Sequence, residues 1–244
     1  MNSPSAIGVQ VENLFKKLGP NQALAGVSMN FEAGLMHGLI GPEGAGKTTL
    51  LRTLLKLLKP DQGEVLYTKD GQSMPFSEIS PSIAYMPQQQ SLYADLSIGE
   101  HLEFFKEMYS IPQGVYLKKR EELLHITRLK EFTDRPAGKL SGGMYKKLGL
   151  MCALLRSPQV MFLDEPTNGV DPISRREFWE LLYSLADQKI LIIVATAYLD
   201  EAERCARAHL IEAGKWIASG VPADLLAREK VSSFDELFIK RAQA

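Results

Sequence analysis

An α/β fold is predicted by three features of this 244-residue sequence. First, an apolar run, a glycine-rich segment and a leucine-rich segment follow one another across residues 35–58, the pattern of a strand, a tight loop and a helix. Second, residues 160–164 and 190–196 are almost wholly apolar, as in buried strands. Third, residues 97–156 show helical periodicity without strand alternation. We therefore predict an α/β core with an inserted helical subdomain.

The whole chain, residues 1–244, is expected to form one domain. Residues 7–36 alternate short β-like pieces with turns at 19–20 and 33–34, so we expect an antiparallel β layer ahead of the glycine-rich loop. The expected parts are a core with its β layer at 1–88 and 157–220, a helical subdomain at 89–156 and a C-terminal helical extension at 221–244.

The composition limits the possible partners. With a net charge of −1 and a pI near 6.5, the chain lacks the basic character of a nucleic-acid-binding protein, so we expect no nucleic acid partner. Cys152 and Cys205 lack metal-ligand spacing and are expected to be reduced structural residues. The N-terminus shows no secretory signal, and the apolar run 191–199 is far shorter than the roughly 20 residues of a membrane-spanning helix. Any membrane association is therefore expected to come through a partner.

The loop GPEGAGKTT, residues 41–49, has the composition that a triphosphate requires. A strand that runs into a glycine-rich turn and then a helix offers free backbone N–H groups and the helix dipole to phosphate oxygens. The lysine can reach the β- and γ-phosphates, and the hydroxyl of the next residue can bind Mg²⁺. The predicted nucleotide-binding residues are Gly41, Pro42, Glu43, Gly44, Ala45, Gly46, Lys47, Thr48 and Thr49, together with Gln88 at the end of the short strand predicted within 81–87.

Two carboxylates end the apolar run VMFLDE, residues 160–165. An acidic pair at the end of a buried strand is costly unless it is used. Asp164 is expected to hold Mg²⁺ through water, and Glu165 to polarise an attacking water as general base. The turn that follows brings Asp171 and Pro172 to the N-cap and N1 positions of the next predicted helix.

A second helix start can face an anion. Ser141 is predicted to cap the helix that follows LSGGM, residues 140–144, while Gly142 and Gly143 leave the N–H groups of its first turn uncovered. Alone, SGG is more typical of a simple helix cap in a loop. Its meaning therefore depends on the other motifs.

Taken together, GPEGAGKTT, the YMPQ glutamine, LSGGM, VMFLDEP, the NGVDP turn and TAYLDEAER resemble the motifs of the nucleotide-binding domain of ABC transporters, over essentially the whole chain. The segments LSGGM, GVDPISRREFW and YLDEAE are most similar to those of ABC-2 type exporter ATPases, particularly the first half of tandem exporter ATPases. The resemblance implies the ABC ATPase fold, with a P-loop NTPase (RecA-like) core, and transport-coupled hydrolysis of ATP with Mg²⁺.

In that family two such domains enclose two ATP molecules, each held by the phosphate loop of one domain and the LSGG motif of the other. The resemblance implies a metal set of Thr48, Gln88 and Asp164, with Gln88 also contacting the membrane partner. It implies a catalytic set of Lys47, Glu165, Ser141 and Gly143, in which Glu165 is the base and the stretch from Ser141 to Gly143 contacts the γ-phosphate held by the opposite subunit. Asp171 is implied to lie in the dimer-interface loop.

The resemblance also implies partners and a location. The partners are transmembrane permease subunits and a second ATP-binding domain, in a heterodimer or as a fused half rather than in a homodimer. The location is the cytoplasmic face of the inner (plasma) membrane, where this chain is expected to be peripheral.

Three positions depart from the family pattern. The family places a histidine after the switch strand, where it holds the γ-phosphate and the attacking water, but this chain has Ala197 there. Leu18 aligns with the aromatic residue that stacks on adenine, unless a shifted register brings Phe15 to that place. Glu43 adds a negative charge to the phosphate loop. The histidines of the chain do not align with the missing one and are expected to be packing or surface residues: His37, His101, His125 and His209.

These departures have unequal consequences. Losing one preorganised transition-state donor typically costs ~10²–10³ in rate, whereas losing one stacking aromatic costs roughly 1–3 kcal/mol of binding. We therefore expect that the chain's own site binds nucleotide but hydrolyses it slowly. The intact LSGGM would complete a competent site on a histidine-bearing partner.

Other classes of protein fit less well. An ABC ATPase of DNA repair needs a long coiled coil between Gln88 and Ser141, where heptads are absent. A ribosome-associated ATPase of the translation-factor type would carry two such domains and a charged linker, and a P-loop kinase would not need LSGGM. A regulatory ATP-binding module with little hydrolysis is the main alternative because of Ala197, although the presence of Glu165 argues against it.

Overall fold

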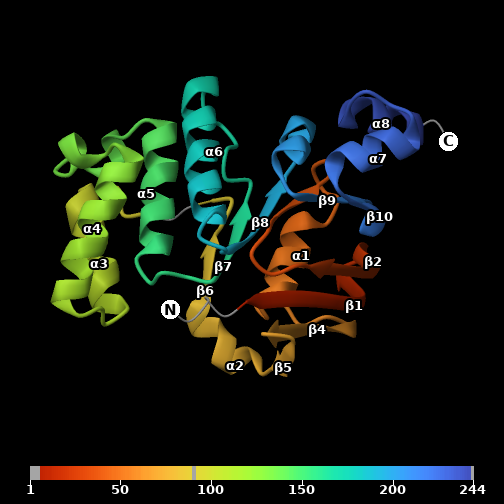
Figure 1. Ribbon diagram of the computed structural model, residues 1–244, viewed down its shortest axis with the longest axis horizontal. Coiled ribbons are helices and arrows are strands. Elements are labelled where there is room, and N and C mark those ends of the chain that lie inside the picture. The colour runs from red at the N-terminus through yellow and green to blue at the C-terminus, as the bar shows by residue number, and fades with distance from the viewer. Residues whose placement is uncertain (1–5, 90–91, 243–244) are drawn as a thin grey trace.

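The computed structural model describes residues 6–89 and 92–242, which form two sheets and the helices around them (Figure 1). Three parts of the sequence predictions lie outside the described residues. They are the N-terminal residues 1–5, Gln90 in the polar run after the strand near Pro87, and residues 243–244 of the C-terminal extension.

The N-terminal part forms the predicted antiparallel layer. Its strands pair in the order β2, β1, β4 and β5, and every pair is antiparallel. The turn between β1 and β2 contains Gly19 with a φ of 59°, a left-handed conformation that glycine adopts without strain. The strands are β1 (Ile7–Leu18), β2 (Asn21–Phe31), β4 (Gln62–Lys69) and β5 (Gln72–Met74).

The second sheet contains the apolar runs. Its strands pair in the order β10, β9, β3, β8, β7 and β6, and all neighbours are parallel except β9 and β10. The carboxyl ends of parallel strands meet at one edge of a sheet, so the residues that follow β3, β7 and β8 come together there. The strands are β3 (Met36–Ile40), β6 (Ile83–Met86), β7 (Val160–Asp164), β8 (Leu191–Thr196), β9 (Arg207–Glu212) and β10 (Lys215–Gly220).

Both faces of this second sheet are covered. In β7, Val160 and Phe162 belong to a core shared with the antiparallel layer and α1, while Met161 and Leu163 belong to a core shared with α5 and α6. Such a strand is buried on both sides, which explains its continuous apolar sequence. The α-helices are α1 (Lys47–Leu54), α2 (Phe76–Ile79), α3 (Ile98–Met108), α4 (Gln113–Thr127), α5 (Gly142–Leu154), α6 (Pro172–Ala186), α7 (Pro222–Glu229) and α8 (Phe234–Ala242).

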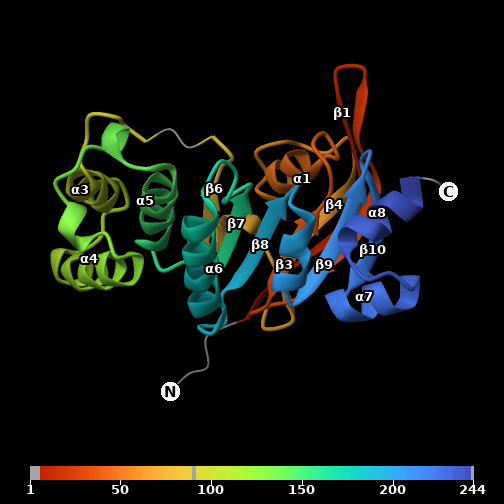
Figure 2. The ribbon, with the colours of Figure 1, turned by 90° about the horizontal axis from the view of Figure 1, so that it is seen from above.

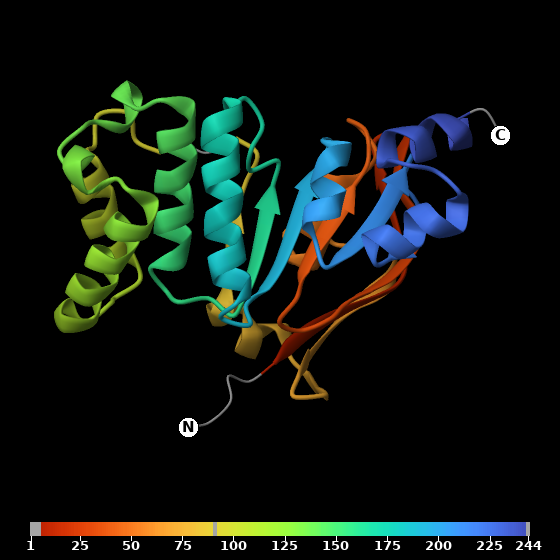
Figure 3. The same ribbon diagram turned by 45° about the horizontal axis from the view of Figure 1, so that its top comes forward.

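The helices α3, α4 and α5 lie together at one end of the molecule, and α7 and α8 lie at the other (Figures 2 and 3). Short 3₁₀ helices connect the elements: η1 (Ser80–Ser82), η2 (Lys130–Phe132), η3 (Ala137–Lys139) and η4 (Leu199–Arg204). The prediction of helices between the strand before Gln88 and β7 is therefore confirmed, although η2, η3 and turns interrupt them.

The predicted helix caps are confirmed. The spacing of Ser97 and Glu100 predicts a capping box, and both of its hydrogen bonds form at the start of α3. Ser141 Oγ accepts from the Met144 N–H at 3.3 Å at the start of α5. Asp171 caps α6, with Pro172 at its first turn.

Two predicted helices are shorter in the structure than the sequence indicates. The leucine-rich run after the phosphate loop is stopped by Pro60, which predicts a helix up to that proline, but α1 ends at Leu54. The buried hydroxyl of Tyr67 donates to the Leu54 carbonyl at 2.8 Å, and Lys56 takes a left-handed φ of 54°, so the chain leaves the helix there. The run LDEAERCARA after β8 predicts a helix, but it forms only the 3₁₀ helix η4 before β9 begins.

A buried histidine pair joins β3 to β9. His37 Nδ1 and His209 Nε2 are 2.9 Å apart, and His37 Nε2 is 3.1 Å from the carbonyl oxygen of Glu32. A carbonyl can only accept, so His37 donates to Glu32, His209 donates to His37, and the hydroxyl of Ser219 donates to His209 Nδ1. Both rings are therefore satisfied as neutral imidazoles, which agrees with their predicted packing role.

The histidine pair predicts a loss of stability in acid. Burial lowers the pKa of His37 to about 4 and that of His209 to about 3, below the ordinary value of 6.5. The unfolded chain binds these protons first, so the free energy of unfolding falls as the pH drops below 6.5, by up to ~1.4 kcal/mol per pH unit for each histidine. Denaturant unfolding at a series of pH values measures this slope. His209→Gln should flatten the slope and the exposed His125→Gln should not; an unchanged slope in His209→Gln would contradict the assignment.

Candidate nucleotide-binding site

The phosphate loop lies between β3 and α1 and depends on two close backbone approaches. A Cβ atom on Gly41 would come within 2.0 Å of the Ile211 carbonyl oxygen. Gly46 is the N-cap of α1 with a φ of 103°, and a Cβ atom there would come within 2.4 Å of the Ala23 carbonyl oxygen. Only glycine fits both places, so the loop is held between β9 and the antiparallel layer.

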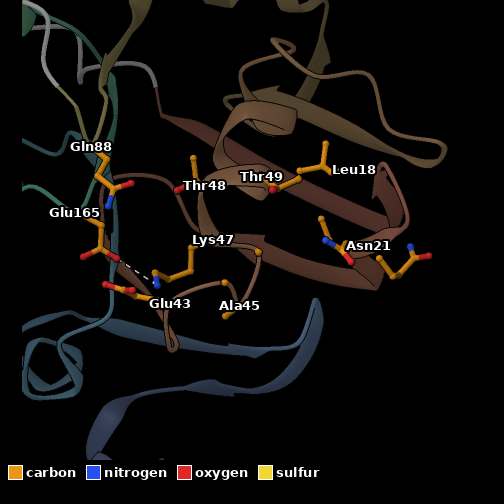
Figure 4. A pocket seen from close by; sticks show the side chains of 13 residues that line it. Leu18, Asn21, Glu43, Ala45, Lys47, Thr48, Thr49, Gln88 and Glu165 are labelled. Carbon is orange, nitrogen blue, oxygen red and sulfur yellow. Dashed lines mark ion pairs between the residues drawn. The ribbon is translucent and has the colours of Figure 1, made fainter.

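The ammonium of Lys47 is held by three oxygens. Its Nζ donates to the carbonyls of Gly41 and Pro42 at 2.8 and 3.0 Å, and it lies 3.2 Å from Oε1 of Glu165 (Figure 4). Both charged side chains are buried, so each compensates for the desolvation of the other. The ion pair links the phosphate loop directly to the end of β7.

Asp164 ends β7 beside the first turn of α1. Thr48 Oγ1 donates to its Oδ1 at 3.0 Å, and Tyr85 Oη donates to its Oδ2 at 3.4 Å. Burial raises the pKa of Asp164, and the two hydroxyls partly offset this effect. A buried carboxylate beside a hydroxyl is the kind of oxygen donor set that Mg²⁺ prefers. The residues therefore fit the predicted metal.

Glu165 follows β7 in a left-handed conformation with a φ of 48°. Its N–H donates to the Ala195 carbonyl at 2.8 Å, and its Oε2 accepts from the Ala197 N–H at 3.3 Å. Ala197 thus lies beside the carboxylate at the end of β8, where the sequence predicted that a residue near the γ-phosphate would be. It contributes a backbone N–H to that carboxylate.

A cavity of about 560 Å³ runs from the Glu165 carboxylate to the turn between β1 and β2. Figure 4 shows Gln88 and Glu165 at one end of it and Leu18 and Asn21 at the other. The predicted residues that line it are Glu43, Gly44, Ala45, Gly46, Lys47, Thr48, Thr49, Gln88 and Glu165. Gly41 and Pro42 do not line the cavity and act through their carbonyls on Lys47.

Leu18, and not Phe15, lines the outer end of the cavity. Leu18 lines the cavity with 45% of its surface exposed, whereas the Phe15 ring lies on Gly26, 3.1 Å from where a Cβ atom would be. Sequence reasoning missed the neighbouring residues Asn21, Gln22 and Ala23, whose only signal was the turn after the first strand.

The LSGG segment does not line this cavity. Gly143 lies against α6, where a Cβ atom would come within 2.4 Å of Ser174, and Gly142 faces the carbonyl of Gly169. Lys146 of α5, the helix that begins with Gly142, lies toward the site, which the sequence did not indicate. Its Nζ donates to the carbonyls of Gln88 at 3.3 Å and Glu165 at 3.4 Å, and burial lowers its pKa.

Comparison with known proteins identifies the family. A sequence profile described as "ABC transporter" matches residues 24–168, which include the phosphate loop, LSGGM and the acidic pair. The chain belongs to the ABC transporter family. It is 43% identical over 203 residues to "Probable multidrug ABC transporter ATP-binding protein YbhF" of Escherichia coli K12, a match that covers 83% of this chain and 35% of that protein. The chain thus spans about a third of this relative.

A second relative is matched over more of its length. The "Nod factor export ATP-binding protein I" of Ralstonia nicotianae is 35% identical over 224 residues, covering 91% of this chain and 69% of that protein. Among solved structures, "Structure of ATP binding subunit of ABC transporter" has a TM-score of 0.81 and 26% identity, covering 95% of this chain and 98% of that one. The predicted ABC ATPase fold is therefore confirmed.

The geometry of the outer cavity predicts that an aromatic side chain at position 18 strengthens nucleotide binding. Leu18→Tyr should tighten ATP binding by roughly 1–3 kcal/mol, because a ring at this place can stack on the base. Titration with a fluorescent ATP analogue measures the dissociation constant. Phe15→Leu is the matched control and should leave it unchanged; unchanged affinity in Leu18→Tyr would place the base elsewhere.

Proposed function

We propose that this chain is the ATP-binding part of an ABC-2 type exporter, which couples ATP binding and hydrolysis to transport by a separate membrane protein. The name of the Nod factor export protein supports the direction of transport, and that of the multidrug transporter protein supports a role in transport. Within residues 6–89 and 92–242, no helix has both the length and the apolar character needed to cross a bilayer. The proposal also includes transmembrane permease subunits and a peripheral position at the cytoplasmic face of the membrane.

The proposed binding step uses the phosphate loop and the oxygens beside it. The N–H groups at the start of α1 and the Lys47 ammonium bind the phosphates. Thr48, Asp164 and Gln88 hold Mg²⁺, which neutralises charge on the phosphates when it is bound. Lys47 lies 3.2 Å from Glu165, so its shift toward phosphate oxygens releases this carboxylate.

The proposed chemical step uses Glu165 as the base. Its carboxylate accepts the proton of the attacking water, and the left-handed backbone at this residue keeps it at the end of β7. The Ala197 N–H on Oε2 fixes its orientation. No side chain at position 197 is available to hold the water, because alanine has neither donor nor acceptor.

We propose slow turnover at this chain's own site because Ala197 has no side-chain donor for the attacking water. The side-chain donor missing at Ala197 corresponds to a loss of ~10²–10³ in rate, whereas the phosphate and metal contacts are retained. We propose that the chain pairs with a second ATP-binding domain that carries the histidine, as a heterodimer or as a fused half. The stretch from Ser141 to Gly143 would complete that partner's site, with Asp171 in the shared interface and residues 89–156 as the helical subdomain.

ATPase assays on the purified chain test this proposal. We expect saturable Mg–ATP binding with very slow hydrolysis, and Ala197→His should increase hydrolysis at high protein concentration, where two copies can close the site. Ala197→Gln, which adds a polar side chain without an imidazole, is the matched control. Brisk hydrolysis by the unmodified chain that collapses in Glu165→Gln would contradict the slow-site proposal.

A further inference from the structure

A buried ionic network lies behind the segment that follows β8. Glu201 in η4 is fully buried, and its Oε1 accepts from Thr167 Oγ1 at 2.7 Å, Arg175 Nε at 2.8 Å and Trp179 Nε1 at 3.0 Å. Its Oε2 has no hydrogen-bond partner in the part of the chain that the structure describes. A buried carboxylate of this kind requires an opposite charge, which Arg175 supplies from α6.

Arg175 also contacts the exposed side of the segment that follows β8. Its Nη2 donates to Oδ1 and Oδ2 of Asp200 at 2.8 and 2.9 Å. Its guanidinium carbon lies 4.3 Å from the centre of the Tyr198 ring. A planar guanidinium can form a fork and a stack at once, which a lysine cannot. One side chain of α6 therefore fixes positions 198, 200 and 201.

Ala197 lies between this fixed segment and the end of β8. On one side, Thr196 pairs with Ile40 in the sheet, and its Oγ1 accepts from the Tyr198 N–H at 3.0 Å. On the other side are the contacts of Arg175. The peptide N–H of Ala197 points at Glu165 Oε2, 3.3 Å away, so its direction depends on both anchors.

We propose that Arg175 is a positioning residue for Glu165: by fixing residues 198–201 it aims the Ala197 N–H at the carboxylate. This peptide N–H then provides the one contact with the base that an alanine at position 197 can offer. The inference rests on the proposed function only in treating Glu165 as the base. The contact itself involves only groups of this chain and does not depend on hydrolysis.

The amide resonance of Ala197 in ¹⁵N-labelled protein tests this proposal without nucleotide. Glu165→Gln removes the charge of the acceptor and should shift this resonance when Arg175 is present. In the Arg175→Ala background we expect most of that shift to be lost. Arg176→Ala is the matched control, because Arg176 is the next residue, has an exposed side chain and pairs with Glu180 on the surface. It should leave the full shift.

A second variant is needed because Arg175→Ala leaves the Glu201 charge buried and unpaired, which destabilises the fold. Tyr198→Leu combined with Asp200→Ala removes the outer contacts of Arg175 and keeps its pair with Glu201. Trp179 emission, measured with Trp216→Phe because these are the two tryptophans of the chain, checks that the buried network is intact.

Loss of most of the Glu165→Gln shift in this doubly substituted protein supports the proposal. A full shift there overturns it, whatever the fate of Arg175→Ala. Brisk ATP hydrolysis would contradict the proposed slow site and leave the amide result unaffected, so the two failures are distinguishable.

Discussion

The burial of two carboxylates at the end of β7 constrains the whole site. A buried charge destabilises the fold unless neighbouring groups compensate for it. For Asp164 the neighbours are hydroxyls, including that of Thr48 on α1. For Glu165 they are the Lys47 ammonium and the Ala197 N–H. These groups come from α1 and from the residue after β8, so the carboxylates are stable only when the phosphate loop and the parallel sheet are assembled together.

The two carboxylates are compensated by different kinds of group. Asp164 faces uncharged hydroxyls and its pKa is raised, so it gains most from a metal ion. Glu165 is already paired with a cation. Its other oxygen meets a peptide N–H of Ala197, where the family pattern supplies a histidine. This difference supports the proposal that the site holds Mg–ATP and orients the attacking water poorly.

Local patterns in the sequence predicted much of this structure. The buried strands β3, β7 and β8, the phosphate loop and the Asp171 cap follow from apolar runs and short-range chemistry. The errors arise where a residue far away in the sequence determines the local structure. The hydroxyl of Tyr67, thirteen positions after Leu54, donates a hydrogen bond to the Leu54 carbonyl, where α1 ends. The network between Arg175 and Glu201 joins two elements that no sequence spacing brings together, so it could not be predicted.

The central claim is that the chain's own site holds ATP without rapid hydrolysis. Photo-crosslinking of 8-azido-ATP in the assembled transporter tests it most directly, because the label stays on the subunit whose phosphate loop bound it. After conditions that allow one round of turnover, the account predicts that the nucleotide attached to this chain is still mainly the triphosphate, while the partner domain carries diphosphate. Diphosphate on this chain at the same level as on the partner would contradict it.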